Sequence, residues 1–262
     1  MDLGISGKTA LVLGASSGLG KAIAIGLAKE GVNVAIAARR ADELANTAAL
    51  LEAEGVKVLP IQWDLKDLSV IPGNIAAIEK ALGPVEILIN NGGGPPPTPA
   101  AAQDPELWQS SFQAMIVPLI AITDAVLPGM RQRGWGRIIT STSSTIQVPL
   151  PNMAMSNSLR AVLHGWSKTL SKEIAKDGVT TNILVPGRIA TDRIAFLDNA
   201  QAQRQNRDAE EVKAENLAAI PMGRLGDPAE YAAMAVFLAG KPASYITGSV
   251  VRVDGGQMPT TS

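Results

Sequence analysis

The sequence predicts an α/β protein: a single doubly wound, Rossmann-type domain with a seven-stranded parallel sheet and helices on both faces. Short apolar segments alternate with helical patterns almost throughout the 262 residues, as expected of repeated βαβ units. A glycine-rich turn joins the first strand to the first helix. Hydrophobic residues make up 46% of the chain, and no repeat or low-complexity linker divides it. Residues 1–262 are therefore expected to form one domain.

The expected elements follow from apolar periodicity and from capping residues. The first helix repeats apolar residues at helical spacing over Leu19–Leu27 until Gly31 ends it. Asp104-Pro105 and Asp227-Pro228 each supply an N-cap aspartate and a proline at the first helical position. The expected strands are Lys8–Leu13, Val32–Ala38, Val56–Ile61, Glu86–Ile89, Arg137–Ser141, Val179–Val185 and Val250–Val253. The other expected helices are Asp42–Glu54, Ile75–Leu82, Pro105 to near Gly134, about Asn157–Lys176, and one that begins after Asp227.

The glycine-rich turn at residues 14–20 has the chemistry of a nucleotide-binding loop. Glycines let the backbone turn sharply and let a diphosphate approach, while the free N–H groups at the helix N-terminus bind its charge. The spacing is G-x-x-x-G-x-G rather than the commoner G-x-G-x-x-G, and a turn without a ligand is the alternative. The candidate cofactor-binding residues here are Gly14, Ser16, Ser17, Gly18, Leu19 and Gly20.

The second strand ends in Ala37-Ala38-Arg39-Arg40, without an acidic residue. Proteins that prefer NAD usually offer a carboxylate to the ribose hydroxyls at this point. Arginine instead suits the 2′-phosphate of NADP, because it is permanently charged and presents a fork of donors. Arg39 is therefore expected to favour NADP over NAD; two solvated arginines are the alternative without a ligand.

Further loops follow the third and fourth strands and are expected beyond the carboxyl ends of the sheet, where ligands bind in such folds. Asp64 is placed either to accept a hydrogen bond from an adenine amino group or to cap the next helix. Asn90 and Gly92 belong to an Asn-Asn-Gly-Gly-Gly segment followed by prolines. The glycines permit close approach to a ligand, although a rigid loop without a ligand fits the segment equally well.

Composition narrows the function classes. The net charge is −1 without a basic block, so neither a nucleic-acid nor an anionic-membrane partner is indicated. The chain has no cysteine, which excludes disulfides and thiolate sites, and no metal site is expected. No apolar run is seen that reaches the ~18 residues of a membrane span, and no signal segment is seen at the N-terminus. A cytoplasmic protein acting on a small molecule is expected.

Taken in order along the chain, five motifs resemble the short-chain dehydrogenase/reductase family. They are the segments Gly14–Gly20, Asn90–Gly93, Gly136–Ser144, Pro186–Thr191 and Ile246–Gly256. The resemblance covers nearly the whole chain and implies a nicotinamide cofactor. It also implies that Pro186, Gly187 and Thr191 belong to a loop that holds the nicotinamide carboxamide. The polar segment that follows, about residues 192–220, is expected to be a mobile lid or an exposed helix pair.

The same resemblance locates the catalytic positions. The family normally uses a Tyr-x-x-x-Lys pair, a serine thirteen residues before the Tyr, and an Asn in the preceding long helix. In this chain Ser156 stands at the Tyr position, Arg160 at the Lys position and Met115 at the Asn position, and Ser143 keeps the serine. Ser143 is then expected to polarise a carbonyl and Arg160 to anchor the nicotinamide ribose. Since an alkyl hydroxyl is a weaker acid than a phenol, the proton donor is water, Ser156 or a group of the substrate.

Three functions remain open at this point. The first is an NADP(H)-dependent oxidoreductase with an atypical proton donor, acting on a partly hydrophobic carbonyl or alcohol such as a 3-oxoacyl thioester or a small ketone. The second is an NADP-binding protein that has lost dehydrogenase activity and acts as a sensor or assembly partner. The third is a non-redox enzyme that uses the cofactor structurally. Because family members commonly pair two long helices across a two-fold axis, a homodimer or homotetramer is expected.

Overall fold

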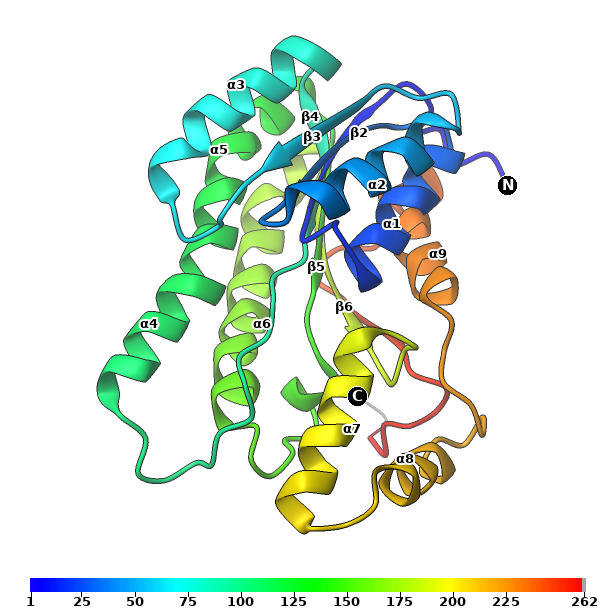
Figure 1. Cartoon of the computed structure of the whole chain (residues 1–262). Coiled ribbons are helices and arrows are strands. Elements are labelled where there is room, and N and C mark those ends of the chain that lie inside the picture. The colour runs from blue at the N-terminus through cyan, green and yellow to red at the C-terminus, as the bar shows by residue number, and fades with distance from the viewer. Residues whose placement is uncertain (261–262) are drawn as a thin grey trace.

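The computed structural model describes residues 1–260, which contain one seven-stranded parallel sheet in the order β3-β2-β1-β4-β5-β6-β7 (Figure 1). The predicted doubly wound α/β fold is confirmed. The strands are β1 (Thr9–Leu13), β2 (Asn33–Ala38), β3 (Val58–Gln62), β4 (Val85–Asn90), β5 (Gly136–Ser141), β6 (Val179–Pro186) and β7 (Val250–Val253). The helices are α1 (Gly18–Lys29), α2 (Ala41–Glu52), α3 (Ile71–Leu82), α4 (Pro105–Met115), α5 (Val117–Arg133), α6 (Ala154–Ile174), α7 (Asp192–Gln205), α8 (Ala209–Ala218) and α9 (Pro228–Ala239).

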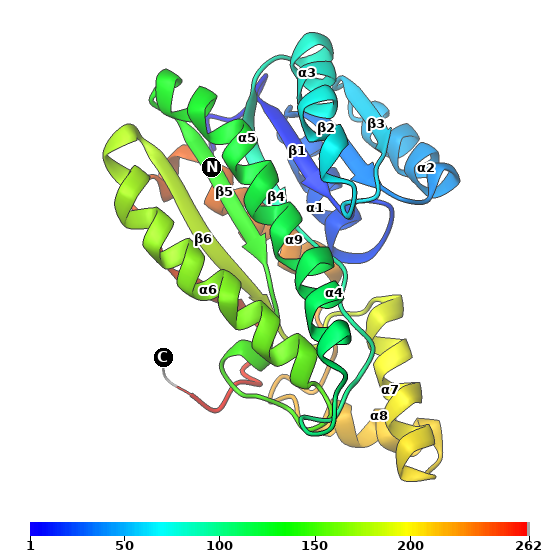
Figure 2. The same cartoon turned by 90° about the vertical axis from the view of Figure 1, so that its left-hand side faces the viewer.

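The sheet is buried on both faces, as a parallel sheet with helical crossovers must be. Alternate residues of β1 point to opposite sides: Ala10 and Val12 join the core under α1, α2 and α9, whereas Leu11 and Leu13 join the core under α3, α5 and α6. Figures 1 and 2 show these two helical layers on either side of the sheet. The strands therefore read as continuous apolar runs rather than as alternating patterns.

The strand order reverses between β1 and β4, since successive strands add outward in opposite directions from this pair. The loops after these two strands consequently diverge to opposite faces and leave a crevice at the carboxyl edge of the sheet. The predicted binding edge thus follows from the topology itself.

The long helix expected from Pro105 to near Gly134 is divided at Ile116 into α4 and α5. Pro118 lies in the first turn of α5. It has no N–H to donate and its ring crowds the carbonyl four residues earlier, so the helical hydrogen-bond ladder is interrupted there. The two helices remain close to one line (Figure 2).

Two other helices begin earlier than expected. Helix α3 begins at Ile71 rather than Ile75, with Pro72 in its first turn, where a missing N–H costs nothing. Helix α6 begins at Ala154 rather than near Asn157, so Ser156 lies in its first turn.

Helices α4 and α5 together form a 29-residue segment that is long and apolar enough to cross a membrane by length and composition, contrary to the expectation that no such run exists; the mean hydropathy of an 18-residue window within it is 1.6. The apolar residues of α5 pack against the sheet instead: Leu119, Ile122 and Val126 are all buried in the core. A core helix passes the same test, and the burial of these three side chains places this face of α5 in the core.

The polar segment expected as a lid or an exposed helix pair forms the helices α7 and α8. They pack together as a lobe beyond the carboxyl edge of the sheet (Figures 1 and 2). A buried ion pair between Arg188 and Asp198 attaches α7 to the loop after β6. Asn216 of α8 donates a second hydrogen bond to Asp198 across 2.7 Å, so one carboxylate holds the loop and both helices.

Candidate active site

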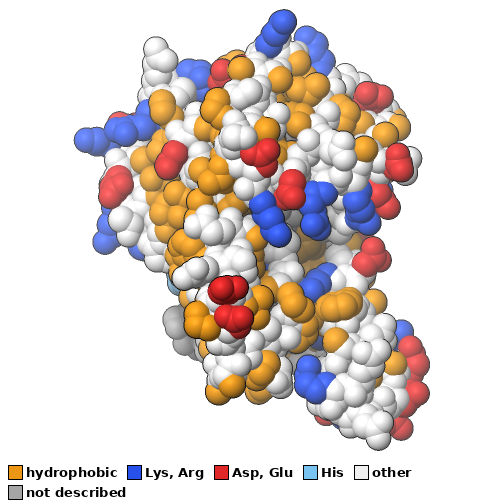
Figure 3. Space-filling view, turned by 60° about the vertical axis from the view of Figure 1, so that its left-hand side comes forward, with side chains coloured by type: hydrophobic (Ala, Val, Ile, Leu, Met, Phe, Trp, Pro, Cys, Tyr) orange, Lys and Arg blue, Asp and Glu red, His pale blue; other side chains and the backbone are white. Residues whose placement is uncertain are grey.

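A cavity of ≈ 1610 Å³ opens at the carboxyl edge of the sheet, between the sheet and the α7–α8 lobe. It is lined by the loops after β1, β2, β3, β4, β5 and β6, by one face of α7 and by residues of α4 and of the N-terminal part of α6. In Figure 3, Lys and Arg side chains gather around the hollow between the body and this lobe. A cavity of this size, lined by both apolar and basic side chains, is suited to a large anionic ligand together with a smaller molecule.

The glycine-rich turn borders the cavity and is shaped by contact with the β4 loop. Gly14 adopts φ +62°, and a Cβ there would lie 2.5 Å from the Asn91 backbone oxygen. A Cβ on Gly20 would lie 2.3 Å from the Gly14 oxygen. Gly20 was expected to bind a cofactor, but it does not line the cavity. Its absent side chain instead lets α1 pack against the turn.

The N-terminus of α1 faces the cavity with its N–H groups uncapped. Ser17 is the N-cap residue, yet its side chain makes no capping hydrogen bond. Of the residues predicted here, Gly14, Ser16, Ser17, Gly18 and Leu19 line the cavity. An uncapped helix N-terminus beside glycines with room for a ligand fits a dinucleotide diphosphate, because both its N–H groups and its dipole favour an anion.

Two arginines stand at the end of β2, where the ribose of a bound dinucleotide lies in such folds. Arg39 is exposed and lines the cavity, and no carboxylate among residues 1–260 forms an ion pair with it. Arg40 is engaged with its surroundings: its guanidinium donates to the Ser17 hydroxyl across 3.1 Å and pairs with Glu43 across 3.7 Å. Arg39 is therefore the better placed of the two to bind a phosphate.

Asp64 does not cap the next helix, because Asp67 is the N-cap of the short helical turn Leu68–Val70 and accepts from the Ser69 N–H. The Asp64 carboxylate accepts a hydrogen bond from the Lys66 backbone N–H across 3.1 Å, a local turn contact. The same side chain is exposed and lines the cavity. A carboxylate held by one oxygen still presents the other to an adenine amino group.

The amide that reaches the cavity after β4 belongs to Asn91, not to Asn90. Asn90 is the last residue of β4 and is fully buried, and its amide donates to the Thr123 hydroxyl across 3.0 Å. Asn91 lines the cavity and donates to the Leu13 oxygen across 3.2 Å. The expectation that Asn90 binds a cofactor is thus corrected. The strand β4 continues through Asn90, and the alternation of side chains along the strand turns Asn90 toward α5. Gly92 lines the cavity as expected.

Ser143 and Ser156 both line the cavity. The Ser143 oxygen accepts hydrogen bonds from the Thr145 N–H across 3.3 Å and the Thr145 hydroxyl across 3.1 Å. Within residues 1–260 no acceptor engages the Ser143 hydroxyl hydrogen, which leaves it free to donate to a ligand. Ser156 is buried in the first turn of α6, and no described residue bonds to its hydroxyl. Met115, at the position of the family's Asn, contributes an apolar side chain to the same wall.

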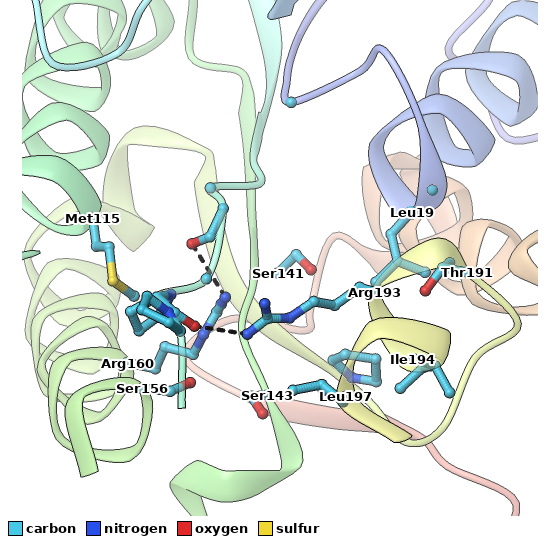
Figure 4. A pocket seen from close by; sticks show the side chains of 18 of the residues that line it. Leu19, Met115, Ser141, Ser143, Ser156, Arg160, Thr191, Arg193, Ile194 and Leu197 are labelled. Atoms are coloured by element: carbon cyan, nitrogen blue, oxygen red, sulfur yellow. Dashed lines mark hydrogen bonds between the residues drawn. The ribbon is translucent and has the colours of Figure 1, made fainter. Parts of the chain in front are cut away.

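Arg160 lies one helical turn after Ser156 and reaches across the cavity (Figure 4). Its guanidinium donates to the Thr142 oxygen across 3.1 Å and to the Gly93 oxygen across 3.4 Å, while its Nε is buried without a partner. Burial, together with the nearby positive charge of Arg193, lowers the pKa of Arg160 to about 10. The group stays charged at neutral pH, at a cost in free energy.

Arg193 is a site residue that the sequence analysis missed. It lies in the first turn of α7 and donates to the Pro95 oxygen across 2.8 Å. Figure 4 shows its guanidinium extending from the Thr191 loop toward Arg160. The sequence placed this residue in a polar segment of undefined role, and only the folded chain brings α7 beside the loop after β4.

The loop after β6 completes the cavity. Pro186, Gly187 and Thr191 all line it, as expected. A Cβ on Gly187 would lie 2.5 Å from the Asp254 Cα, so this glycine lets the C-terminal strand region approach closely. Thr191 precedes α7, and its hydroxyl donates only to the Ile189 oxygen, across 3.3 Å.

The amino-acid sequence is similar to those of known dehydrogenases and reductases. Residues 8–202 match the sequence signature described as short chain dehydrogenase. The chain is 34% identical over 258 residues to the NADPH-dependent reductase BacG of Bacillus subtilis (strain 168), covering 97% of this chain and 99% of that protein. It is 33% identical over 252 residues to the acetoacetyl-CoA reductase of Shinella zoogloeoides, covering 95% and 98%.

Solved structures show the same relationship. L-sorbose reductase from Gluconobacter frateurii, crystallised with NADPH and L-sorbose, superposes with a TM-score of 0.90 at 35% identity. The superposition covers 99% of this chain and 100% of that one. By signature, by sequence identity over nearly its whole length and by structure, this chain belongs to the short-chain dehydrogenase family.

Proposed function

We propose that this protein is an NADP(H)-dependent oxidoreductase that interconverts a carbonyl group and an alcohol with an atypical proton donor. The observation that carries the proposal is the free Ser143 hydroxyl hydrogen in a cavity that also holds Arg160 and the uncapped N-terminus of α1. The names of the relatives, among them an NADPH-dependent reductase and an acetoacetyl-CoA reductase, support it.

The residues present fit NADP. The glycine turn leaves room for a diphosphate, and the uncapped N–H groups of α1 offer it hydrogen bonds. The unpaired guanidinium of Arg39 offers charge and paired donors to a 2′-phosphate. Asn91, Gly187 and Thr191 line the cavity where the nicotinamide end would be held. When bound, NADPH supplies the hydride that a carbonyl reduction requires.

The chain's own groups then handle charge and proton. Ser143 donates a hydrogen bond to the substrate carbonyl oxygen and so polarises it. Arg160 keeps the role of anchoring the nicotinamide ribose that the family resemblance implies, and its charge also stabilises the negative charge that develops on that oxygen during reduction. Ser156, one turn from Arg160, passes a proton from solvent to the oxygen, which completes the alcohol. The positive charge of Arg160 reduces the need for a strong acid at the Ser156 position.

The substrate we propose is a partly hydrophobic carbonyl compound. Prolines 95–97 and the side chains of Leu150, Met153, Ile194 and Leu197 contribute apolar surface to the lining of the same cavity. A 3-oxoacyl-thioester-like compound is one such molecule. We further propose that the protein is a cytoplasmic homodimer or homotetramer.

The test is NADPH oxidation by the purified protein with a panel of ketones, 3-oxo acids and 3-oxoacyl thioesters. A reductase gives turnover that Ser143→Ala lowers by about 10²-fold or more, with NADPH affinity unchanged. The matched control is Ser244→Ala, which removes an exposed hydroxyl outside the cavity. Turnover that Ser143→Ala leaves intact contradicts the assignment of this serine.

A cofactor-binding protein without dehydrogenase activity is the second candidate, and one observation favours it. No tyrosine lines the cavity: the Tyr231 phenol is buried and bonded to Ser141 across 2.8 Å, and Tyr245 is fully exposed elsewhere. Burial also raises the pKa of Tyr231, so it is a poor proton donor. Tight NADPH binding without oxidation by any carbonyl on the panel decides for this candidate.

A further inference from the structure

Two guanidinium groups converge at one point of the cavity wall. A Cβ on Gly94 would lie 3.1 Å from the Arg193 Nη2 and 3.3 Å from the Arg160 Nη2, so both nitrogen atoms lie against the same glycine. The two side chains come from different elements, α6 and α7, and Figure 4 shows them pointing toward each other beside Ser143 and Ser156. Two positive charges that lie against the same residue repel each other, and an anion between them would offset this repulsion.

No such anion comes from the part of the protein that the structure describes. Among residues 1–260, no carboxylate forms an ion pair with Arg160 or with Arg193. Arg188, which lines the same cavity, differs from these two arginines because it forms an ion pair with Asp198. Burial lowers the pKa of both groups, and the positive charge of Arg193 lowers that of Arg160 further.

Both arginines have unused donors. A guanidinium carries five N–H donors. Arg160 uses its Nη atoms on two backbone oxygens and leaves Nε buried without a partner. Arg193 donates to one backbone oxygen and otherwise lies over the Phe196 ring, 5.3 Å from its centroid. These backbone contacts fix the positions of the guanidinium groups without neutralising them, and this preorganises an anion site.

We propose that Arg160 and Arg193 together bind a carboxylate of the substrate, which is therefore a 2-oxo or 3-oxo acid. The inference rests on the proposed reductase function and narrows its substrate class from carbonyl compounds in general, thioesters included, to oxo acids. Guanidinium groups match a planar carboxylate through paired hydrogen bonds. The Arg160 guanidinium lies 3.1 Å from the oxygen of Thr142, the residue directly before Ser143, so a carboxylate bound by Arg160 would lie near the carbonyl group that Ser143 polarises. A neutral ester or thioester leaves both charges without a counterion.

The decisive comparison is between an oxo acid and its neutral counterpart. We expect kcat/KM for acetoacetate to exceed that for methyl acetoacetate by about tenfold or more, and pyruvate to be preferred over its methyl ester in the same way. Arg193→Gln should lower kcat/KM for the acids by about 10–100-fold and leave the esters within about threefold. Arg193→Lys, which keeps the charge but loses the fork, should restore part of the loss.

Cofactor affinity provides a readout that does not depend on turnover. We expect NADPH to bind Arg193→Gln as tightly as it binds the unmodified protein, as measured by titration of NADPH fluorescence. An equal loss of NADPH and acid binding would assign Arg193 to the cofactor and overturn the proposal. The matched control is Lys213→Gln, which removes one positive charge from the same lobe outside the cavity, where Lys213 pairs with Glu210 across 3.2 Å.

Binding of oxamate, a carboxylate that resembles a 2-oxo acid but is not reduced, separates this inference from the proposed reaction. Calorimetry should show oxamate binding to the NADPH complex, with loss of binding in Arg193→Gln and no binding of methyl oxamate. Oxamate binding without any carbonyl reduction supports the anion site and contradicts the reductase. Equal reduction of acids and esters, unchanged in Arg193→Gln, supports the reductase and overturns the anion site.

Discussion

The Arg160 guanidinium donates a hydrogen bond to the Thr142 backbone oxygen across 3.1 Å, which ties α6 to the end of β5 directly before Ser143. One side chain thus positions the loop that carries the retained serine and places a positive charge beside Ser156. The same contact explains how this chain keeps an ordered site without the Tyr and Lys that its family normally uses.

Restoring the family's pair tests whether proton transfer is the weak step. Ser156→Tyr combined with Arg160→Lys should raise the single-turnover rate of NADPH oxidation with ketones by about tenfold or more, because a phenol beside an ammonium is a better acid. Ser156 lines the cavity, so the larger side chain can project into open space. Met115→Asn, which restores the asparagine that the family normally has at this position, is the third substitution to combine with these two. A rate that stays unchanged in the restored protein indicates that Ser156 is not at the proton-transfer position.

Arg39 should determine the choice of cofactor. The unmodified protein should bind NADPH about 10–100-fold more tightly than NADH, and Arg39→Ala should remove most of that difference, because a charge-assisted contact to the 2′-phosphate is lost. Titration of both cofactors measures this. Lys80→Ala, on the distant α3, is the control. Equal affinities of the unmodified protein for NADPH and NADH contradict the prediction.

Exposed apolar residues on α4 and α6 should mediate self-association. Phe112 and Val162 are 37% and 40% exposed. Burying them against a second copy removes apolar surface from water and stabilises an oligomer. Light scattering should therefore show a dimer or tetramer that Val162→Asp, or Phe112→Asp, converts to a monomer. Leu50→Asp, on α2 at the other face of the sheet, should leave the mass unchanged. A monomeric unmodified protein at micromolar concentration refutes the assignment.

Glu230 should make stability depend on acid pH. Its hydrogen bonds with Arg224 and with the Asp227 backbone N–H lower its pKa from 4.5 to about 2. A depressed carboxylate pKa adds stability above the ordinary value, and the contribution disappears as pH falls from 4.5 through about 2. Urea unfolding should show Glu230→Gln to be less stable at neutral pH and equal to the unmodified protein at the acid end. Glu79→Gln, exposed on α3, should show no such difference.

Much of the fold could be predicted because local signals agreed with it. Strand β7 is found at the expected residues, and Asp227 and Glu230 form the capping box that the Asp-Pro-Ala-Glu sequence indicates. The failures have local causes too. The Pro-Gly-Asn start of α3 is also the composition of a turn, which hid its first residues. The division between α4 and α5 was missed because the apolar pattern continues through Pro118, the proline that interrupts the helix.

Only those site residues could be predicted whose loops could be assigned to the end of a particular strand. Residue periodicity did not show that β4 includes Asn90, and this single residue decides which asparagine reaches the cavity. Arg193 was beyond sequence reasoning for another reason. Its contact with Pro95 joins residues 98 positions apart, and no local pattern encodes such a meeting.

The contact between Asn91 and the glycine-rich turn has a consequence for protein engineering. A Cβ on Gly20 would meet the Asn91 amide nitrogen at 2.7 Å, and that amide donates to the oxygens of Leu13 and Gly14. The first βα turn and the loop after β4 therefore pack closely against each other, although they are far apart in sequence. A chimera that takes its glycine-rich turn from a relative, in order to change cofactor preference, must also take the residue that the relative has at the position of Asn91. Otherwise the new turn will not pack against the loop after β4.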